Sequence, residues 1–343
     1  MAERSYHYAA KDAVREEWMN YLPPVFTDPL DLVLYLPARE NLELPLYLQK
    51  GLSPLQLIGA EHDSEQLPRV QASANGIQLV SGNIRDAVEH IVRKGLPHLR
   101  AANLDFDGKS HSFIEELIAL ARVMPSVRGS YLAITSYAAR DKGALLQGTV
   151  NTTKIFTALG AMTFLKRYGN MLGMYERLLR HIPHSESSAM AHFQREMGLL
   201  WWIVLMFGVI DRPSDPSEYH KVNQTFLDES AQALEDITSR VKERLGTRPD
   251  ESEIIMIPDK RLHALLTGRR VSARVTSMRR LAYWSSNRQP MRTWFFTIQP
   301  LSEQDRPMTM QQLVSQVWDL ACSTPLVYLD EDGMRITIEG KRR

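Results

Sequence analysis

The sequence predicts an α/β fold whose N-terminal part is a doubly wound, mostly parallel sheet. Over the first 150 residues, short apolar runs alternate with helix-like segments, at a spacing of about 20 to 25 residues that is typical of βαβ units. After residue 150 this alternation stops, and strand-like runs return only beyond residue 253. We therefore expect three parts: a sheet domain at 1–150, a helical connector at 151–248, and a small basic α+β portion at 249–343.

Each element of the first part has its own signal. The strands are expected where the chain has short apolar runs, at residues 31–36, 55–60, 77–80, 101–106 and 130–135. Helices are expected between them at residues 41–50, 64–74, 84–94 and 112–124. Gly51, directly after the first of these helices, is a typical C-terminal stop.

The remaining elements follow a different pattern. Three long helices are expected at residues 152–182, 188–210 and 223–245, and a further helix at 309–321. Strands are expected at residues 254–257, 271–276 and 293–298. A terminal hairpin should pair residues 327–329 with 335–338 across the turn at Asp332 and Gly333.

Composition excludes several classes of protein. The chain has 343 residues, of which 44% are hydrophobic and 24% charged, which excludes a disordered or collagen-like chain. The single cysteine, Cys322, cannot form an internal disulfide and indicates a reducing compartment. The charged N-terminus has no signal-peptide core, and the longest apolar stretch, residues 197–210, is too short to span a bilayer. We therefore expect a cytoplasmic protein with no membrane partner.

The charges are distributed unevenly. Residues 260–302 carry nine of the 41 basic side chains and no acidic one, which leaves 32 basic against 40 acidic residues elsewhere. Such a segment favours a polyanion as partner, and its aromatic residues are suited to stacking on unpaired bases. We expect nucleic acid, RNA or DNA, to contact this set: Arg269, Arg270, Arg279, Arg280, Trp284, Arg288 and Arg292. The alternative is a contact with the acidic part of a second copy of the chain, in a homo-oligomer.

Polar residues at the strand ends are the candidates for a ligand site. In a doubly wound sheet, ligands bind at the carboxyl ends of the strands. The first strand is followed by Pro37 and Ala38, the second by Glu61, the third by Asn83 and Ile84, and the fourth by Asp105. A carboxylate such as Glu61 can accept both hydroxyl hydrogens of a ribose. Asn83 could bind an adenine edge.

These strand ends resemble the first motifs of class I S-adenosylmethionine-dependent methyltransferases, a Rossmann-like family. The similarity rests on residues 32–36, on Glu61 in Ile-Gly-Ala-Glu, and on Gly82-Asn83, and it covers roughly residues 25–150. The run Asn-Leu-Asp-Phe-Asp-Gly at 103–108 lies where that family has its substrate-facing motif. Asp105 and Gly108 match the Asp-Pro-aromatic-Gly pattern of the RNA guanine-N2 methyltransferase branch, whereas the proline and the aromatic position do not match.

The resemblance implies an S-adenosylmethionine-dependent methyltransferase that acts on nucleic acid. S-adenosylmethionine would lie against Pro37, Ala38, Glu61, Asn83 and Ile84. Asp105 would be the catalytic residue, orienting the accepting amino group or easing the loss of its proton. The turn after the first strand contains no glycine, unlike that of the family. The alternative is therefore a catalytically inactive scaffold of the same fold that binds nucleic acid or assembles into oligomers.

Asp105 and Asp107 also allow a second alternative. Two carboxylates at i and i+2 after an apolar strand resemble the signature of haloacid-dehalogenase-like phosphatases, in which the first aspartate is the nucleophile and both help to hold magnesium. That family has the motif on its first strand, whereas here it follows the fourth. No paired Asp-Asp motif follows downstream, and no histidine or cysteine spacing indicates another metal site.

Overall fold

The structure is a computed structural model that describes part of the chain. The described residues are 8–38, 40–96, 99–106, 114–126, 128–137, 171–181, 271–302 and 304–339, with 189, 192, 196, 199, 200, 203, 204 and 207. The chain divides into two compact units. Unit 1 comprises Met1–Ala139, Thr276–Pro300 and Pro325–Ile338, and unit 2 comprises Arg140–Val275, Leu301–Thr324 and Glu339–Arg343.

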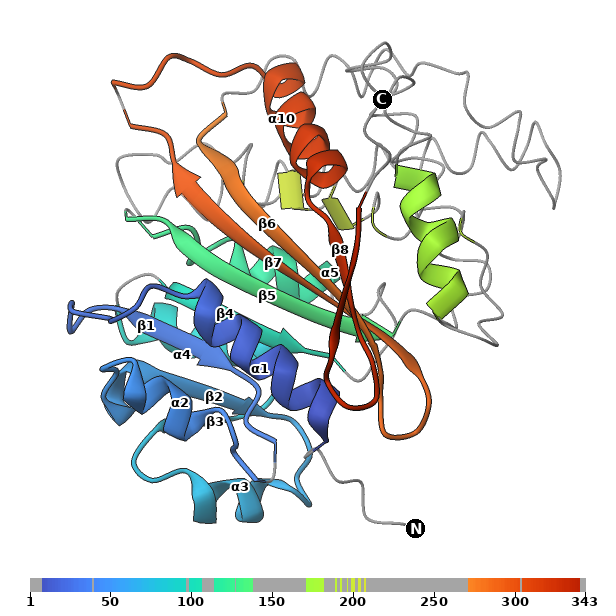
Figure 1. The fold of residues 1–343 in the computed structure, drawn as a ribbon. Coiled ribbons are helices and arrows are strands. Elements are labelled where there is room, and N and C mark those ends of the chain that lie inside the picture. Colours follow the sequence, from blue (N-terminus) through green and yellow to red (C-terminus); the bar gives the residue numbers. More distant parts are fainter. Residues whose placement is uncertain are drawn as a thin grey trace, which may run out of the picture. The chain divides into compact units, whose positions relative to one another are not determined.

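The described residues form one nine-stranded mixed sheet with the order β3-β2-β1-β4-β5-β7-β6-β8-β9 (Figure 1). The strands are β1 (Leu32–Tyr35), β2 (Leu57–Glu61), β3 (Gln78–Ser81), β4 (Leu99–Asp105), β5 (Ser130–Tyr137), β6 (Ala273–Trp284), β7 (Pro290–Pro300), β8 (Leu326–Leu329) and β9 (Arg335–Ile338). Strands β1 to β5 are mutually parallel. Strand β7 is antiparallel to β5, and β8 pairs in parallel with β6 and antiparallel with β9. The fold class is thus α/β with a mostly parallel mixed sheet.

Helices occupy most of the connections. They are α1 (Ala9–Tyr21), α2 (Leu44–Gln49), the 3₁₀ turn η1 (Pro54–Gln56), α3 (Leu67–Ser73), α4 (Ile84–Arg93), α5 (Ile114–Leu120) and α10 (Met310–Ser323). Residues 171–181 are also helical. The expected helices and strands within the described residues are therefore present, with α2, α3 and α5 shorter than expected. The remaining parts of the expected helices at 152–182 and 188–210, the helix at 223–245 and the strand at 254–257 lie outside the described residues.

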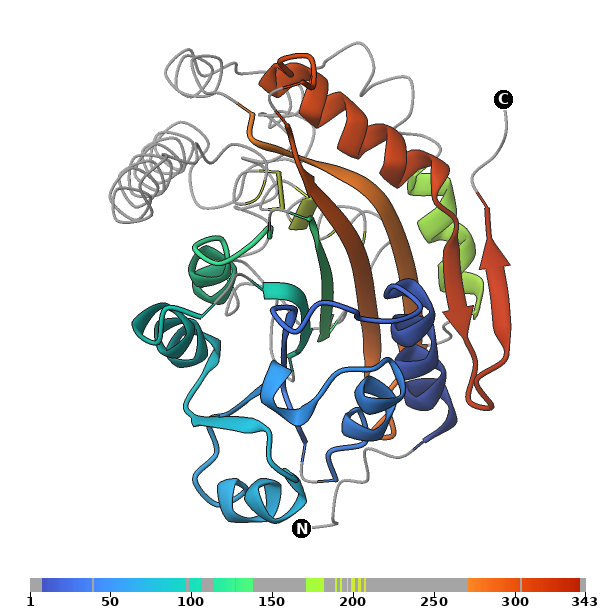
Figure 2. The ribbon, with the colours of Figure 1, turned by 90° about the vertical axis from the view of Figure 1, so that its left-hand side faces the viewer.

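The sheet of unit 1 has helices on both faces. Alternate residues of β1 point to opposite faces: Val33 and Tyr35 join a buried cluster with α1 and α2, whereas Leu32 and Leu34 are buried outside that cluster. Helix α4 packs against α5 and contacts β2 and β3. Figure 2 shows α4 and α5 on one side of the strands and α1 on the other.

The first correction to the sequence expectations is α1, which was not predicted. Its buried residues Ala10, Val14 and Trp18 lie four apart, so they form one stripe of the helix. The Trp18 indole donates a hydrogen bond to the Tyr47 hydroxyl at 2.9 Å, and the rings of Trp18 and Phe295 lie 5.5 Å apart. The N-terminal segment is therefore part of the core on one face of the sheet.

The second correction concerns the end of the chain. The residues expected to form a separate basic α+β portion contribute β6 to β9 to the same sheet as the N-terminal strands. Strand β6 continues to Trp284, beyond the expected end at residue 276, so Arg279 and Arg280 lie within the strand. The physical reason is the apolar run at 281–283, which is buried and extends the strand beyond residue 276.

Candidate active site at the carboxyl edge of the sheet

The five parallel strands place their carboxyl ends along one edge of the sheet. In the register of the sheet, Tyr35 pairs with Gly59 of β2 and with Asn103 of β4. Glu61 lies two residues after Gly59 on β2, and Asp105 lies two residues after Asn103 on β4. Both therefore lie on the same face of the sheet as Tyr35, on the two strands that flank the end of β1. The fold thus brings together two carboxylates that are 44 positions apart in the chain.

The turn after β1 is packed tightly without a glycine. Pro37 is buried and Ala38 is half-buried. A Cβ atom at Gly59 would come within 2.8 Å of the Pro37 ring, so the ring fills the space that a side chain on β2 would need. Asn41, whose φ of 47° is left-handed, closes the turn, accepts a hydrogen bond from the Tyr35 hydroxyl at 2.9 Å and donates one to the Ser73 carbonyl at 3.2 Å.

Glu61 ends β2 with one carboxylate oxygen already engaged. Its Oε1 accepts a hydrogen bond from the Asp63 amide at 2.8 Å, and His62 Nδ1 lies 3.7 Å from the same oxygen. The Glu61 side chain is only 14% exposed, whereas that of His62 is 84% exposed. Oε2 accepts no hydrogen bond from the described residues, so it is available to a hydroxyl donor.

Asn83 begins α4 and uses its side chain as the N-cap. Its Oδ1 accepts a hydrogen bond from the Asp86 amide at 3.2 Å, and the Asp86 carboxylate accepts one from the Asn83 amide at 2.8 Å. The Asn83 side-chain NH₂ donates no hydrogen bond to the described residues. Ile84 is buried at the first helical position, where the backbone N–H has no partner within a helix. Gly82, with φ of 144°, lets the chain turn from β3 into the helix.

Asp105 is bound by a lysine from α1. Its Oδ2 forms an ion pair with the ammonium group of Lys11, whose side chain is 7% exposed, whereas that of Asp105 is 26% exposed. Lys11 Nζ also lies 3.4 Å from the hydroxyl of Tyr283, which is fully buried near the end of β6. Oδ1 of Asp105 accepts no hydrogen bond from the described residues. The result is a carboxylate with one oxygen fixed by Lys11 and the other without a donor among the described residues.

Lys11, Asp105 and Tyr283 form a cluster in which the lysine stays charged. Burial lowers the pKa of Lys11, but the nearby Asp105 and Tyr283 outweigh burial and hold that pKa above its ordinary value. Tyr8, the N-cap residue of α1, also lies near Lys11, Asp105 and Tyr283. Burial raises the pKa of Tyr283 and of Tyr8, although the Lys11 charge opposes this rise. At neutral pH the side chains of Lys11, Tyr8 and Tyr283 therefore supply one ammonium group and two neutral phenols beside Asp105.

Sequence reasoning missed Lys11, Tyr8 and Tyr283. The four-residue spacing of Ala10, Val14 and Trp18 was a usable signal for α1. Nothing in the sequence indicates that Lys11 faces inward, because lysine is almost never fully buried unless it is paired. Its partner is 94 residues away along the chain.

Three of the arginines expected to bind nucleic acid do not form one exposed surface. Arg280 and Arg292 are 1% and 2% exposed on adjacent strands, so neither lies on an open surface. Arg279 forms an ion pair with Glu17 of α1, and its guanidinium lies 5.8 Å from the Tyr21 ring. Residues 260–302 contain no acidic side chain, but Glu17 of α1 supplies a negative charge to Arg279. For these three residues, burial and pairing replace the expected exposed phosphate-binding surface.

Trp284 and Arg288, two other residues of the expected nucleic-acid-binding set, lie at the carboxyl end of β6. Trp284 is half-buried at the end of β6, and Arg288 is exposed with a left-handed φ of 56° in the turn between β6 and β7. Arg269 and Arg270 lie outside the described residues. So does Asp107, the second carboxylate of the phosphatase alternative. Within the part of the chain that the structure describes, no group of three or more His, Cys, Asp or Glu side chains could hold a metal ion.

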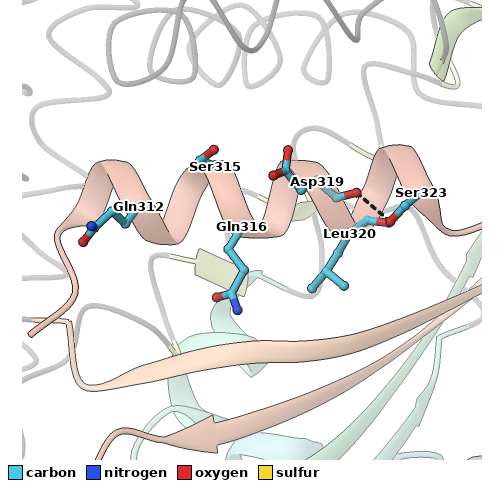
Figure 3. Close-up of a pocket in the computed structure, with 6 residues that line it drawn as sticks. All are labelled: Gln312, Ser315, Gln316, Asp319, Leu320 and Ser323. Carbon is cyan, nitrogen blue, oxygen red and sulfur yellow. Dashed lines mark hydrogen bonds between the residues drawn. The ribbon is translucent and has the colours of Figure 1, made fainter. Parts of the chain in front are cut away.

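A hollow lies along α10 in unit 2. The described residues that line it all belong to this helix: Gln312, Ser315, Gln316, Asp319, Leu320 and Ser323. Figure 3 shows these side chains along the helix, with the Ser323 hydroxyl bonded to the Asp319 carbonyl of the preceding turn at 2.7 Å. None of these residues is among those at the carboxyl edge of the sheet, so this hollow is not the candidate site.

None of the helices in the described ranges combines the length and the apolar character needed to cross a bilayer. Comparison of the chain with protein-family models and with curated proteins finds no match.

Proposed function

We propose that this chain is a class I S-adenosylmethionine-dependent methyltransferase-like enzyme with a doubly wound, Rossmann-like sheet. The observation that carries the proposal is the strand order β3-β2-β1-β4-β5-β7-β6, in which β7 runs opposite to β5. This order is similar to that of class I methyltransferases, in which a reversed last strand lies beside the fifth. The order reverses between β1 and β4, where such sheets bind ligands.

The residues at this edge fit the polar groups of the cofactor. Glu61 Oε2 can accept from a ribose hydroxyl, and the Asn83 NH₂ and the Ile84 amide are donors for an adenine edge. The Pro37 ring and Ala38 would form the wall beside the methionine part. Bound S-adenosylmethionine would supply a methyl group carried on a sulfonium sulfur.

In the proposed reaction, Asp105 acts on the acceptor. An acceptor nitrogen that donates a hydrogen bond to Oδ1 would be oriented with its lone pair toward the methyl carbon. As the nitrogen takes the methyl group that the bound cofactor would supply, with the sulfonium sulfur as leaving group, Oδ1 would accept the proton that the nitrogen loses. Asp105 is then both the orienting group and the proton acceptor.

For the acceptor, nucleic acid remains the first class to test. Trp284 and Arg288 support it, because a half-buried indole and an exposed guanidinium stand at the carboxyl edge of β6. An aromatic face can stack on an unpaired base, and arginine pairs with phosphate. The inactive scaffold remains the alternative, favoured by the Pro37 ring packed on Gly59 in place of a glycine-rich turn.

Calorimetric titration with S-adenosylmethionine and with S-adenosylhomocysteine tests the proposal. We expect binding by the wild-type chain and binding about tenfold weaker or more in Glu61→Gln. Hydrogen bonds to charged groups contribute about 1.5–3 kcal/mol, and 1.4 kcal/mol is a factor of ten. The control is Glu65→Gln, which changes an exposed carboxylate in the same loop and should bind as the wild type does.

The outcomes separate the two functions. Binding of both ligands together with methyl transfer to RNA or DNA supports the enzyme. Binding without transfer to any nucleic acid would exclude that acceptor class. No heat with either ligand at high concentration would leave the inactive scaffold.

A further inference from the structure

Helix α1 carries two buried cations, Lys11 and Arg15. They differ in how far the carboxylates that they bind are exposed to solvent. Arg15 Nε binds Glu43 at 2.9 Å and Arg15 Nη1 binds Asp12 at 2.7 Å. Glu43 is 8% exposed, so the Arg15–Glu43 pair lies inside the core. Lys11, one turn earlier in the helix, binds a carboxylate that is 26% exposed and whose Oδ1 accepts from none of the described residues.

We propose that Lys11 is the positioning residue of Asp105, fixing Oδ2 so that only Oδ1 faces the acceptor; this inference rests on the proposed function. Lys11 does not itself touch the acceptor, because its side chain is enclosed by α1, β4 and β6. It acts through the rotation of the carboxylate. An aspartate side chain without such a partner samples several rotamers, and only some of them direct an oxygen at the acceptor.

Tyr283 supports the same geometry from a different strand. Its hydroxyl lies 3.4 Å from Lys11 Nζ, its ring centre lies 5.9 Å from that atom, and it is also hydrogen-bonded to Thr293 of β7. The ammonium is thus held by the ends of β4 and β6 together. Since its raised pKa keeps Lys11 protonated, the lysine cannot receive the acceptor's proton, and that task stays with Asp105.

The test compares Lys11→Met with Arg15→Met. Both variants remove one buried cation from α1, and both should unfold at lower temperature than the wild type. Per mole of folded protein, we expect Lys11→Met to lower kcat by about 10- to 100-fold, the order expected when a reacting group is misplaced by about 1 Å. The affinity for S-adenosylmethionine should stay within about twofold, since Glu61 and α4 are untouched. Arg15→Met should keep kcat within about threefold of the wild type.

A conservative variant separates positioning from packing. Lys11→Arg keeps the charge and should recover most of the lost kcat, whereas Lys11→Gln should behave like Lys11→Met. Equal losses of kcat in Lys11→Met and Arg15→Met would overturn the inference, because the effect would then come from destabilising α1. The same holds if Lys11→Arg and Lys11→Met are equally impaired.

A second readout needs no activity. Lysine ammonium groups in water exchange their protons fast, so a buried, hydrogen-bonded Lys11 should give one protected ammonium signal in ¹H–¹⁵N correlation spectra. The signal should be missing in Lys11→Met and shifted in Asp105→Asn. If the wild-type chain shows no protected ammonium, the positioning inference is wrong whatever the activity. If the signal is present but no methyl group is transferred to any acceptor, it is the proposed function that fails.

Discussion

At the residue scale, Asn41 shows how a single side chain replaces the glycine that the turn after β1 lacks. Asparagine tolerates the left-handed conformation better than other side chains that have a Cβ. Its buried amide also joins the Tyr35 hydroxyl to the Ser73 carbonyl, which ties β1 to the end of α3. The turn that would face the cofactor is therefore held by hydrogen bonds as well as by the Pro37 ring.

We expect Asn41→Ala to lower the free energy of unfolding by about 1–3 kcal/mol, since it leaves buried polar groups unpaired and keeps a side chain at a positive φ. Asn41→Gly relieves the φ but still loses both hydrogen bonds, so it should be less destabilising than alanine. Urea denaturation of the three proteins measures the difference. A glycine variant less stable than the alanine variant would contradict the assigned backbone conformation.

At the element scale, the N-terminus of α4 combines a structural and a ligand-binding role in one residue. The capping box of Asn83 and Asp86 satisfies two amides at the start of the helix, and the apolar stripe of Ile84, Val88 and Ile91 buries it. The cap uses the oxygen of the Asn83 amide, and the nitrogen is the part proposed to meet adenine. The two roles can be separated by substitution.

Asn83→Ser keeps a capping oxygen and removes the amide nitrogen, whereas Asn83→Ala removes both. We expect the alanine variant to lose about 1 kcal/mol of unfolding free energy and the serine variant only a few tenths. Both should bind S-adenosylmethionine more weakly, by about five- to tenfold for one neutral hydrogen bond. Urea denaturation and calorimetry measure the two effects. Wild-type affinity in Asn83→Ser would mean that the side-chain NH₂ does not meet the ligand.

At the scale of the whole sheet, the hairpin of β6 and β7 joins the C-terminal part of the chain to the N-terminal strands. Its residues are separated from β5 by more than 130 positions, yet β7 pairs with β5 over eight residues from Ser130 to Tyr137. The hairpin brings Tyr283 to Lys11 and Arg279 to Glu17, so α1, β4 and β6 meet at one place. It also places the exposed Arg288 at the edge where an acceptor would enter.

This arrangement predicts which arginine responds to salt. If the acceptor is nucleic acid, affinity should fall with salt, and Arg288→Ala should reduce the slope of log K against log salt by about one unit for one phosphate contact. Arg280→Ala and Arg292→Ala should instead lower stability, because both guanidinium groups are buried. Fluorescence titrations at several salt concentrations, with thermal melts, test this. A wild-type chain that binds no RNA or DNA at low salt would exclude nucleic acid as acceptor and leave self-association to account for the exposed charge.

By itself, the sequence determined the elements whose signals are local. The strands β1 to β5, the helices between them, the stop at Gly51 and the terminal hairpin around Gly333 follow from apolar periodicity and turn residues a few positions apart. The positions of Glu61, Asn83 and Asp105 at strand ends follow for the same reason, since a parallel sheet aligns its carboxyl ends. These positions required no knowledge of how the strands are ordered.

Only the tertiary structure decided the partners of those residues. The nine basic residues at 260–302 look unopposed in sequence, but Arg279 meets Glu17 from a helix more than 250 residues earlier. Asp105 looks like a solvated strand end, but Lys11 binds one of its oxygens. Charge pairing acts through distances of a few ångströms in space, while sequence patterns register only neighbours along the chain. For that reason the location of the candidate site could be predicted, and the lysine and the tyrosine that complete it could not.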